Sequence, residues 1–168
     1  MFIDREELRS RGLGYADSRS MTLVEELGAG IDGSIWGTNR KSAIKVHIRE
    51  ASYVREREVY RRLRERQAWS MCGFQIPRLL DVDDHFKVIE MSIVSPPFVL
   101  DFAGSYLDQP PDYSAEVMEQ WRAEKADIFG ERWETVEMIL YEFRRHGIYY
   151  MDVSANNIRF AEGPSSAI

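Results

Sequence analysis

Hydrophobic and polar positions divide residues 22–160 into a strand-rich half followed by a helix-rich half. The first half predicts three strands, at residues 22–27, 34–37 and 42–48, with a glycine-rich turn between the first two. Because short turns join consecutive strands, we expect an antiparallel meander. Two further strands are predicted at residues 76–82 and 86–91, on either side of a turn at Asp83–Asp84.

Three segments are predicted to be helices, two of them from the 3.6-residue periodicity of an amphipathic helix. Residues 51–67 have apolar positions at Val54, Val59, Tyr60 and Leu63, of which the last three form a stripe on one side. Ser114 is a suitable N-cap for a helix that runs towards Phe129, and a last helix is predicted from residue 131 to 146, ended by Gly147.

The order of these elements predicts an α+β chain with a small sheet lobe and a helical lobe. Residues 1–21 are polar and weakly periodic, and we interpret them as a loose lead-in. The sheet lobe is expected over 22–92. A proline-containing linker and the helical lobe are expected over 93–160, and a polar tail over 161–168.

Composition narrows the class of protein. The net charge is −6, which argues against nucleic-acid binding because neutralising phosphates needs clustered cations. The sequence contains no run of about 18 apolar residues, so we expect no membrane-spanning helix. The single cysteine, Cys72, excludes an internal disulfide and a cysteine-rich zinc site, so we expect a cytoplasmic protein.

Three glycines, Gly28, Gly30 and Gly33, lie between the first two predicted strands. The same spacing in a dinucleotide-binding fold needs a helix directly afterwards, and here a strand follows. The arrangement resembles the glycine-rich loop of protein kinases, which covers the phosphates of ATP. By that resemblance Ile35 contacts the adenine. A glycine-rich hairpin without a ligand is the alternative.

A lysine on the third strand extends the resemblance. Ala43-Ile44-Lys45 matches the kinase strand that carries the phosphate-binding lysine, and strand alternation places Ala43 and Lys45 on one face. The resemblance implies that Ala43 floors the adenine pocket and that Lys45 reaches the phosphates. Its carboxylate partner is Glu56 or Glu58. We predict Glu56, because it shares a side of its helix with the apolar stripe.

Residues 146–158 resemble the kinase catalytic loop, in which an aspartate precedes an asparagine by five residues. By this match Asp152 accepts the proton of the substrate hydroxyl and Asn157 binds a metal ion. Glu90 and Met91 correspond to the hinge, with backbone groups that face adenine. The resemblance covers residues 22–160 and implies a kinase-like fold: a five-stranded antiparallel sheet with one helix, then a minimal helical lobe.

The sequence also departs from the kinase pattern. It contains no Asp-Phe-Gly, so the second metal ligand is missing. Asn157 alone holds Mg²⁺ poorly, and we expect weak metal dependence of nucleotide binding. Asp32, near the tip of the glycine loop, either repels phosphates or points to solvent as a turn residue. Asp32 or Glu162 of a second chain could supply a carboxylate if the protein dimerises.

Three functions fit these patterns. The first is an ATP-binding protein with the activity of a minimal phosphotransferase, in which Asp152, Lys45 and Glu56 are the catalytic residues. The second is a pseudokinase-type module that binds a nucleotide or a partner without catalysis. The third is an interaction domain that has lost nucleotide binding.

Overall fold

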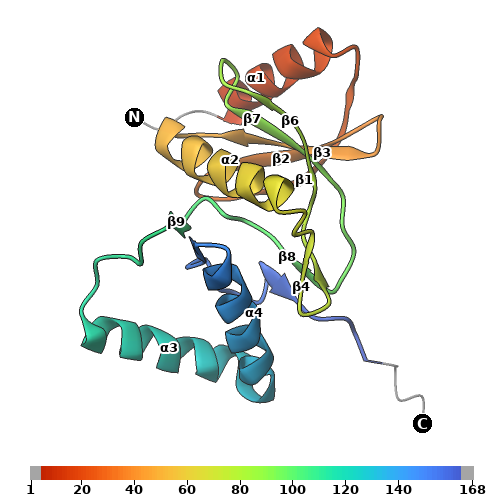
Figure 1. Cartoon of the computed structure of the whole chain (residues 1–168). Coiled ribbons are helices and arrows are strands. Elements are labelled where there is room, and N and C mark those ends of the chain that lie inside the picture. The colour runs from red at the N-terminus through yellow and green to blue at the C-terminus, as the bar shows by residue number, and fades with distance from the viewer. Residues whose placement is uncertain (1–4, 164–168) are drawn as a thin grey trace.

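The computed structural model describes residues 5–163, so the end of the predicted polar tail, residues 164–168, and residues 1–4 of the lead-in lie outside it. Its central element is a five-stranded antiparallel sheet in the order β1-β2-β3-β7-β6 (Figure 1). The predicted sheet and its meander are therefore confirmed. The strands are β1 (Leu23–Ala29), β2 (Gly33–Thr38), β3 (Ser42–His47), β6 (Leu79–Asp83) and β7 (Val88–Ser92).

Helix α1 (Arg5–Ser18) covers one face of the sheet (Figure 1). Tyr15 and other buried residues of α1 form a core with Ile44 and Val46 of β3. The prediction of a loose lead-in, and of only one helix on the sheet, is wrong. The pattern misled because α1 packs partly through Gly12, where even an added Cβ atom would lie 3.4 Å from the Val46 side chain.

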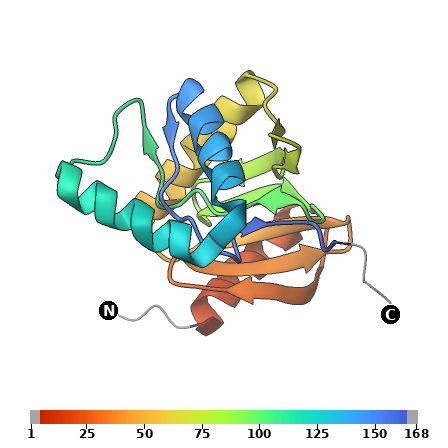
Figure 2. The same cartoon turned by 90° about the horizontal axis from the view of Figure 1, so that it is seen from below.

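Helix α2 (Glu50–Glu65) packs on the opposite face, with the predicted stripe of Val59, Tyr60 and Leu63 buried. Helices α3 (Ala115–Phe129) and α4 (Trp133–Arg145) lie beyond α2, on the side of the sheet away from α1 (Figures 1 and 2). A 3₁₀ turn at Gly130–Arg132 joins them. The Ser114 hydroxyl accepts a hydrogen bond from the Val117 amide, as expected of an N-cap.

Short strands connect the two halves of the chain. In a second sheet β11 (Ile158–Arg159), β8 (Phe98–Val99), β5 (Phe74–Gln75) and β4 (Ser70–Met71) lie side by side. The pair β9 (Tyr106–Leu107) and β10 (Ile148–Tyr149) joins the linker to the catalytic-loop-like segment. One hydrophobic core runs through α2, α4, the central sheet and these strands.

Within residues 5–163, none of the helices combines the length and the apolar character that a membrane span needs.

Candidate active site

A buried ion pair lies between the sheet and α2. The Lys45 Nζ of β3 is 2.7 Å from the Glu56 Oε2 of α2, and the two residues are only 4% and 1% exposed. The predicted pair is therefore present. Glu58, the alternative partner, instead pairs with Arg57 and Arg61 on the outside of the helix.

Besides the ammonium of Lys45, Glu56 accepts hydrogen bonds from His47 of the same strand and from the linker backbone. The His47 Nε2 lies 2.6 Å from the same Oε2 atom, and the Phe102 amide donates to Oε1 at 3.2 Å. Burial acts to raise the pKa of Glu56, but the charge of Lys45 and the hydrogen bond from His47 outweigh it and lower this pKa. Glu56 is therefore an ionised carboxylate that fixes the position of Lys45.

Asp101 is a site residue that the sequence reasoning missed. It follows β8 and has a φ of +63°, in the left-handed region, and its Oδ1 is 3.0 Å from the Lys45 Nζ. Burial alone would lower the pKa of Lys45, but the charges of Glu56 and Asp101 outweigh burial and raise it. Lys45 is thus charged and held by two carboxylates.

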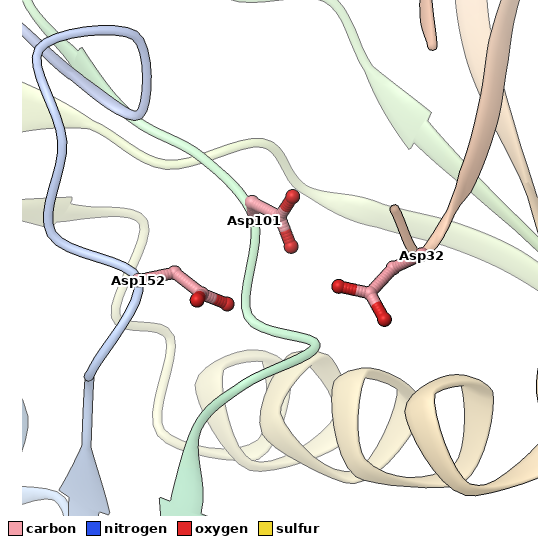
Figure 3. Close-up of side chains that lie close together, drawn as sticks. All are labelled: Asp32, Asp101 and Asp152. Atoms are coloured by element: carbon pink, nitrogen blue, oxygen red, sulfur yellow. The ribbon is translucent and has the colours of Figure 1, made fainter. Parts of the chain in front are cut away.

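Two further carboxylates converge on Asp101, as Figure 3 shows. Asp32 comes from the turn between β1 and β2, and Asp152 from the segment after β10. One carboxylate oxygen from each of the three residues lies within 4.8 Å of the other two. Asp32 does not point away from the site: its Oδ1 accepts hydrogen bonds from Ser52 Oγ of α2 at 2.8 Å and from Arg49 at 3.1 Å.

Asp152 is positioned by the backbone of the linker. Its Oδ2 accepts a hydrogen bond from the Gly104 amide at 2.9 Å, and a Cβ atom at Gly104 would lie only 2.4 Å from that oxygen. Residue 104 must therefore be glycine for this contact. Burial and the nearby charge of Asp101 raise the pKa of Asp152. A carboxylate with a raised pKa is a better proton acceptor than an ordinary aspartate.

The three carboxylates offer the ligands that Mg²⁺ prefers. Two oxygens bound to one Mg²⁺ ion are at most about 4.2 Å apart, so the cluster needs only a small contraction to hold one ion. The sequence pattern indicated a missing second metal ligand, whereas folding brings the carboxylates of Asp32 and Asp101 to Asp152. Asn157 donates from Nδ2 to the Asp152 carbonyl at 2.9 Å, which leaves its amide oxygen to approach a metal.

The three glycines of the loop have different surroundings. Nothing lies within 4 Å of a Cβ atom added at Gly28 or Gly30, so there the loop is open. A Cβ atom at Gly33 would lie 2.1 Å from the Val46 carbonyl oxygen, so Gly33 permits the pairing of β2 with β3. Ile35, which pairs with Lys45 in that ladder, is half-buried.

The predicted adenine-binding residues are covered in this conformation. Ala43 is 6% exposed and belongs to the core that includes Val99 and Ile158. Glu90 and Met91 lie in the middle of the sheet, where β7 pairs with β3 on one side and β6 on the other. Neighbouring strands flank their backbone on both sides in this structure, and their contact with adenine stays a prediction. Strand β7 ends at Ser92, so the first backbone groups without a strand partner come after that residue.

The Glu90 side chain turns to the opposite face of the sheet. It accepts hydrogen bonds from the Tyr15 hydroxyl at 2.7 Å and from Ser42 Oγ at 2.6 Å. Glu90 is thus part of the attachment of α1, which pattern analysis missed together with the helix.

No family model and no curated protein matches this sequence. Among solved structures, the chain is similar to complexes of the aminoglycoside phosphotransferase APH(2″)-IIa, which has a protein-kinase-like fold. In the streptomycin–ATP ternary complex the TM-score is 0.43 and the identity 12%, over 93% of this chain and 43% of that chain. In the gentamicin complex the values are 0.45 and 16%, over 93% and 42%. This chain thus spans less than half the length of the solved chains it resembles.

Proposed function

We propose that this chain binds ATP together with a divalent metal ion and transfers the γ-phosphoryl group to a hydroxyl. The observation that carries the proposal is the position of Asp32, Asp101 and Asp152 around the buried Lys45–Glu56 pair. A cluster of three carboxylates repels a polyphosphate, whereas a fixed lysine attracts one. Both features serve the same ligand when it arrives as a metal complex.

The metal ion would be held by Asp101 and Asp32, with the amide oxygen of Asn157 as a further ligand, so that Asp152 stays available to take a proton. When bound, a divalent ion neutralises these carboxylates and polarises phosphate oxygens. Lys45 would bind a phosphate in place of Asp101, which now occupies its free side at 3.0 Å. Glu56 would keep Lys45 in position during this exchange.

The nucleotide base would lie against Ile35 and Ala43, under the open part of the loop at Gly28 and Gly30. Because Ala43 and Lys45 are covered here, entry requires the linker carrying Asp101 to move away from β3. Ile93, the exposed residue directly after Ser92, would be the first to offer backbone groups to adenine.

Asp152 would act as the base. It takes the proton of the acceptor hydroxyl while that oxygen forms a bond to the γ-phosphorus. The bond from this phosphorus to the β-phosphate oxygen breaks, and ADP leaves with the electron pair. The hydrogen bond from Gly104 keeps the Asp152 carboxylate aimed at the cluster.

Calorimetric titration with ATP, with and without Mg²⁺ or Mn²⁺, tests the binding step. We expect binding that strengthens at least tenfold with the metal, since otherwise four negative phosphate charges meet three carboxylates. Lys45→Gln should abolish it, while Lys41→Gln, at an exposed turn, should leave it unchanged. Absence of saturable binding at millimolar ATP would favour the interaction domain instead.

Transfer is tested separately by ADP release and by labelled-phosphate transfer, with Asp152→Asn as the control. Metal-dependent ATP binding without transfer would identify the pseudokinase-type module. One structural observation favours the pseudokinase-type module. The Lys45 side chain is already bound by two carboxylates, which compete with a phosphate for it.

A further inference from the structure

A cavity lies beside the catalytic-loop-like segment and is not used by the nucleotide in the proposal above. Its volume is about 320 Å³, near the lower end for small-molecule sites. The N-terminal part of α3, the C-terminal part of α4 and residues 149–151 form its walls, and Pro110 and Pro111 form its edge. Met151, which lines the cavity, directly precedes Asp152, so the cavity lies next to the chain segment that carries the proposed base.

The lining of the cavity is aromatic. Tyr113, Trp121 and Tyr149 contribute rings, and the two prolines add flat apolar surface. The lining contains no aspartate or glutamate, and its one charged residue is Arg144. Flat aromatic walls favour a planar ring system, which stacks on or packs edge-on against them.

Arg144 gives the cavity a preference for negative charge. It is exposed, and within residues 5–163 its side chain has no hydrogen-bond or ion-pair partner. The adjacent Arg145, in contrast, is paired with Glu142 at 3.1 Å. A guanidinium that the fold leaves unpaired can bind a carboxylate or a similar anion through two parallel hydrogen bonds.

Tyr113 connects this cavity to the carboxylate cluster. Tyr106 on β9 lies beside it, and Tyr113, burial and the charge of Asp152 together raise the pKa of Tyr106. Tyr106 in turn pairs with Tyr149 between β9 and β10. The cavity and the base are therefore joined through neighbouring side chains.

We infer that this cavity is the acceptor site, and that it takes a planar ring compound with a free hydroxyl and an anionic group. The ring lies among Tyr113, Trp121 and Tyr149, the anion pairs with Arg144, and the hydroxyl is directed towards Asp152. The inference rests on the proposed phosphotransfer, in which that hydroxyl loses its proton to Asp152 as its oxygen bonds to the γ-phosphorus and ADP departs. The lining offers no carboxylate to pair with a polycationic acceptor.

The binding test uses 6-hydroxy-2-naphthoate, whose fluorescence reports its environment, in the absence of nucleotide and metal. We expect saturable binding with a Kd below about 1 mM. Arg144→Gln should weaken it about tenfold, the loss of one charge-assisted interaction. The matched control Arg145→Gln should leave it unchanged. The methyl ester of the probe should bind the unmodified protein and Arg144→Gln equally, and gentamicin, a polyamine, should not compete.

Three outcomes would overturn the inference. The first is no saturable binding, and the second is binding that is insensitive to Arg144→Gln. The third is loss of the bound probe at protein concentrations at which sedimentation detects a dimer. The last would assign the cavity to an interface with a second copy. Because the probe is titrated without ATP, these outcomes are independent of the nucleotide tests. Probe binding that depends on Arg144 but is followed by no phosphorylation with Mg²⁺–ATP would refute the phosphotransfer instead.

Discussion

At the scale of single residues, His47 distinguishes this site from a simple lysine–glutamate pair. A carboxylate only accepts hydrogen bonds, so the 2.6 Å contact requires a hydrogen on His47 Nε2. His47 and Glu56 are both buried, and Lys45 shares the same carboxylate oxygen. The orientation of Glu56, and through it that of Lys45, therefore depends on His47.

Replacing His47 by Phe keeps a buried ring but removes this donor. We expect the free energy of unfolding to fall by about 2–3 kcal/mol, the cost of losing a hydrogen bond to a buried charge. Urea denaturation monitored by circular dichroism measures it. His85→Phe, at an exposed turn, is the matched control and should change little. Equal effects of the two substitutions would contradict the role of His47.

The ionised form of Asp152 destabilises the folded protein. Partial burial of its carboxylate and the nearby charge of Asp101 both disfavour ionisation, and both therefore raise the pKa of Asp152. A group whose pKa is higher in the folded state stabilises the protein below its unfolded pKa, about 3.9 for aspartate. That stability is lost as the pH rises through the folded pKa. At neutral pH, where Asp152 is ionised, this carboxylate therefore lowers the free energy of unfolding of the metal-free protein.

We accordingly expect Asp152→Asn to raise the Tm of the metal-free protein at pH 7. The Asn side chain can still accept the hydrogen bond from Gly104, and the repulsion by Asp101 disappears. The gain should shrink as the pH falls towards about 4, because Asp152 is then protonated. Differential scanning calorimetry of both proteins at the two pH values checks it. A lower Tm for Asp152→Asn at pH 7 would contradict the assignment.

The sequence predicted the site residues whose positions follow from periodicity. Strand alternation placed Lys45, and the apolar stripe of the helix selected Glu56 over Glu58. The convergence of Asp101 and Asp32 on Asp152 could not be found in this way, since both belong to irregular segments. Their convergence depends on chain turns, such as the left-handed conformation of Asp101, that no hydrophobic pattern encodes.

At the scale of elements, the turn between β1 and β2 combines an open tip with a closed base. The Gly30 amide donates to the Gly33 carbonyl at 2.9 Å, which closes the turn. Gly33 lies directly against the β3 backbone, whereas Gly30 faces open space. One glycine is thus required by the fold, and another remains available to a ligand.

This difference predicts unequal effects of adding a methyl group. Gly33→Ala should destabilise the protein by about 1–3 kcal/mol, because the Cβ atom would collide with the Val46 carbonyl and β2 would have to shift. Gly30→Ala should leave the stability nearly unchanged. Chemical denaturation of the two variants gives both values. A loss at Gly30 as large as that at Gly33 would contradict the geometry.

The elements that the sequence did not predict share a physical cause. Helix α1 buries Gly12 and Ala16 beside Tyr15, so small side chains replace the apolar stripe that identifies a helix. The short strands β8 to β11 have two residues each, fewer than any period-two pattern needs. Tertiary pairing, rather than local preference, makes both kinds of element.

At the scale of the whole molecule, the sheet half and the helical half share one core. Phe102 of the linker contacts Tyr60 of α2, Phe143 of α4 and Tyr150, with ring centroids 5.2–5.6 Å apart. Outside this aromatic cluster, Arg62 of α2 pairs with Asp108 at 2.7 Å. The two halves are therefore not separate folding units.

We predict a single cooperative unfolding transition, with equal calorimetric and van't Hoff enthalpies. Val46→Ala, between the sheet and α1, and Phe143→Leu, in α4, should each lower the Tm of that same transition. Scanning calorimetry of the three proteins tests it. Two resolved transitions, with each variant shifting only one, would show that the halves unfold independently.

Because Lys45 is buried, the rate at which its amine reacts with a reagent reports how often the linker that carries Asp101 moves away from it. The other three lysines, at positions 41, 87 and 125, are exposed or partly exposed, so an amine-acylating reagent reaches them at once. Lys45 is held as a charged ammonium by Glu56 and Asp101, and acylation requires a free, neutral amine. Its labelling is therefore limited by how often the linker leaves β3. Mass spectrometry assigns the slow phase of acylation to Lys45. The rate of that phase measures how often the site opens, and any ligand must enter through the same opening.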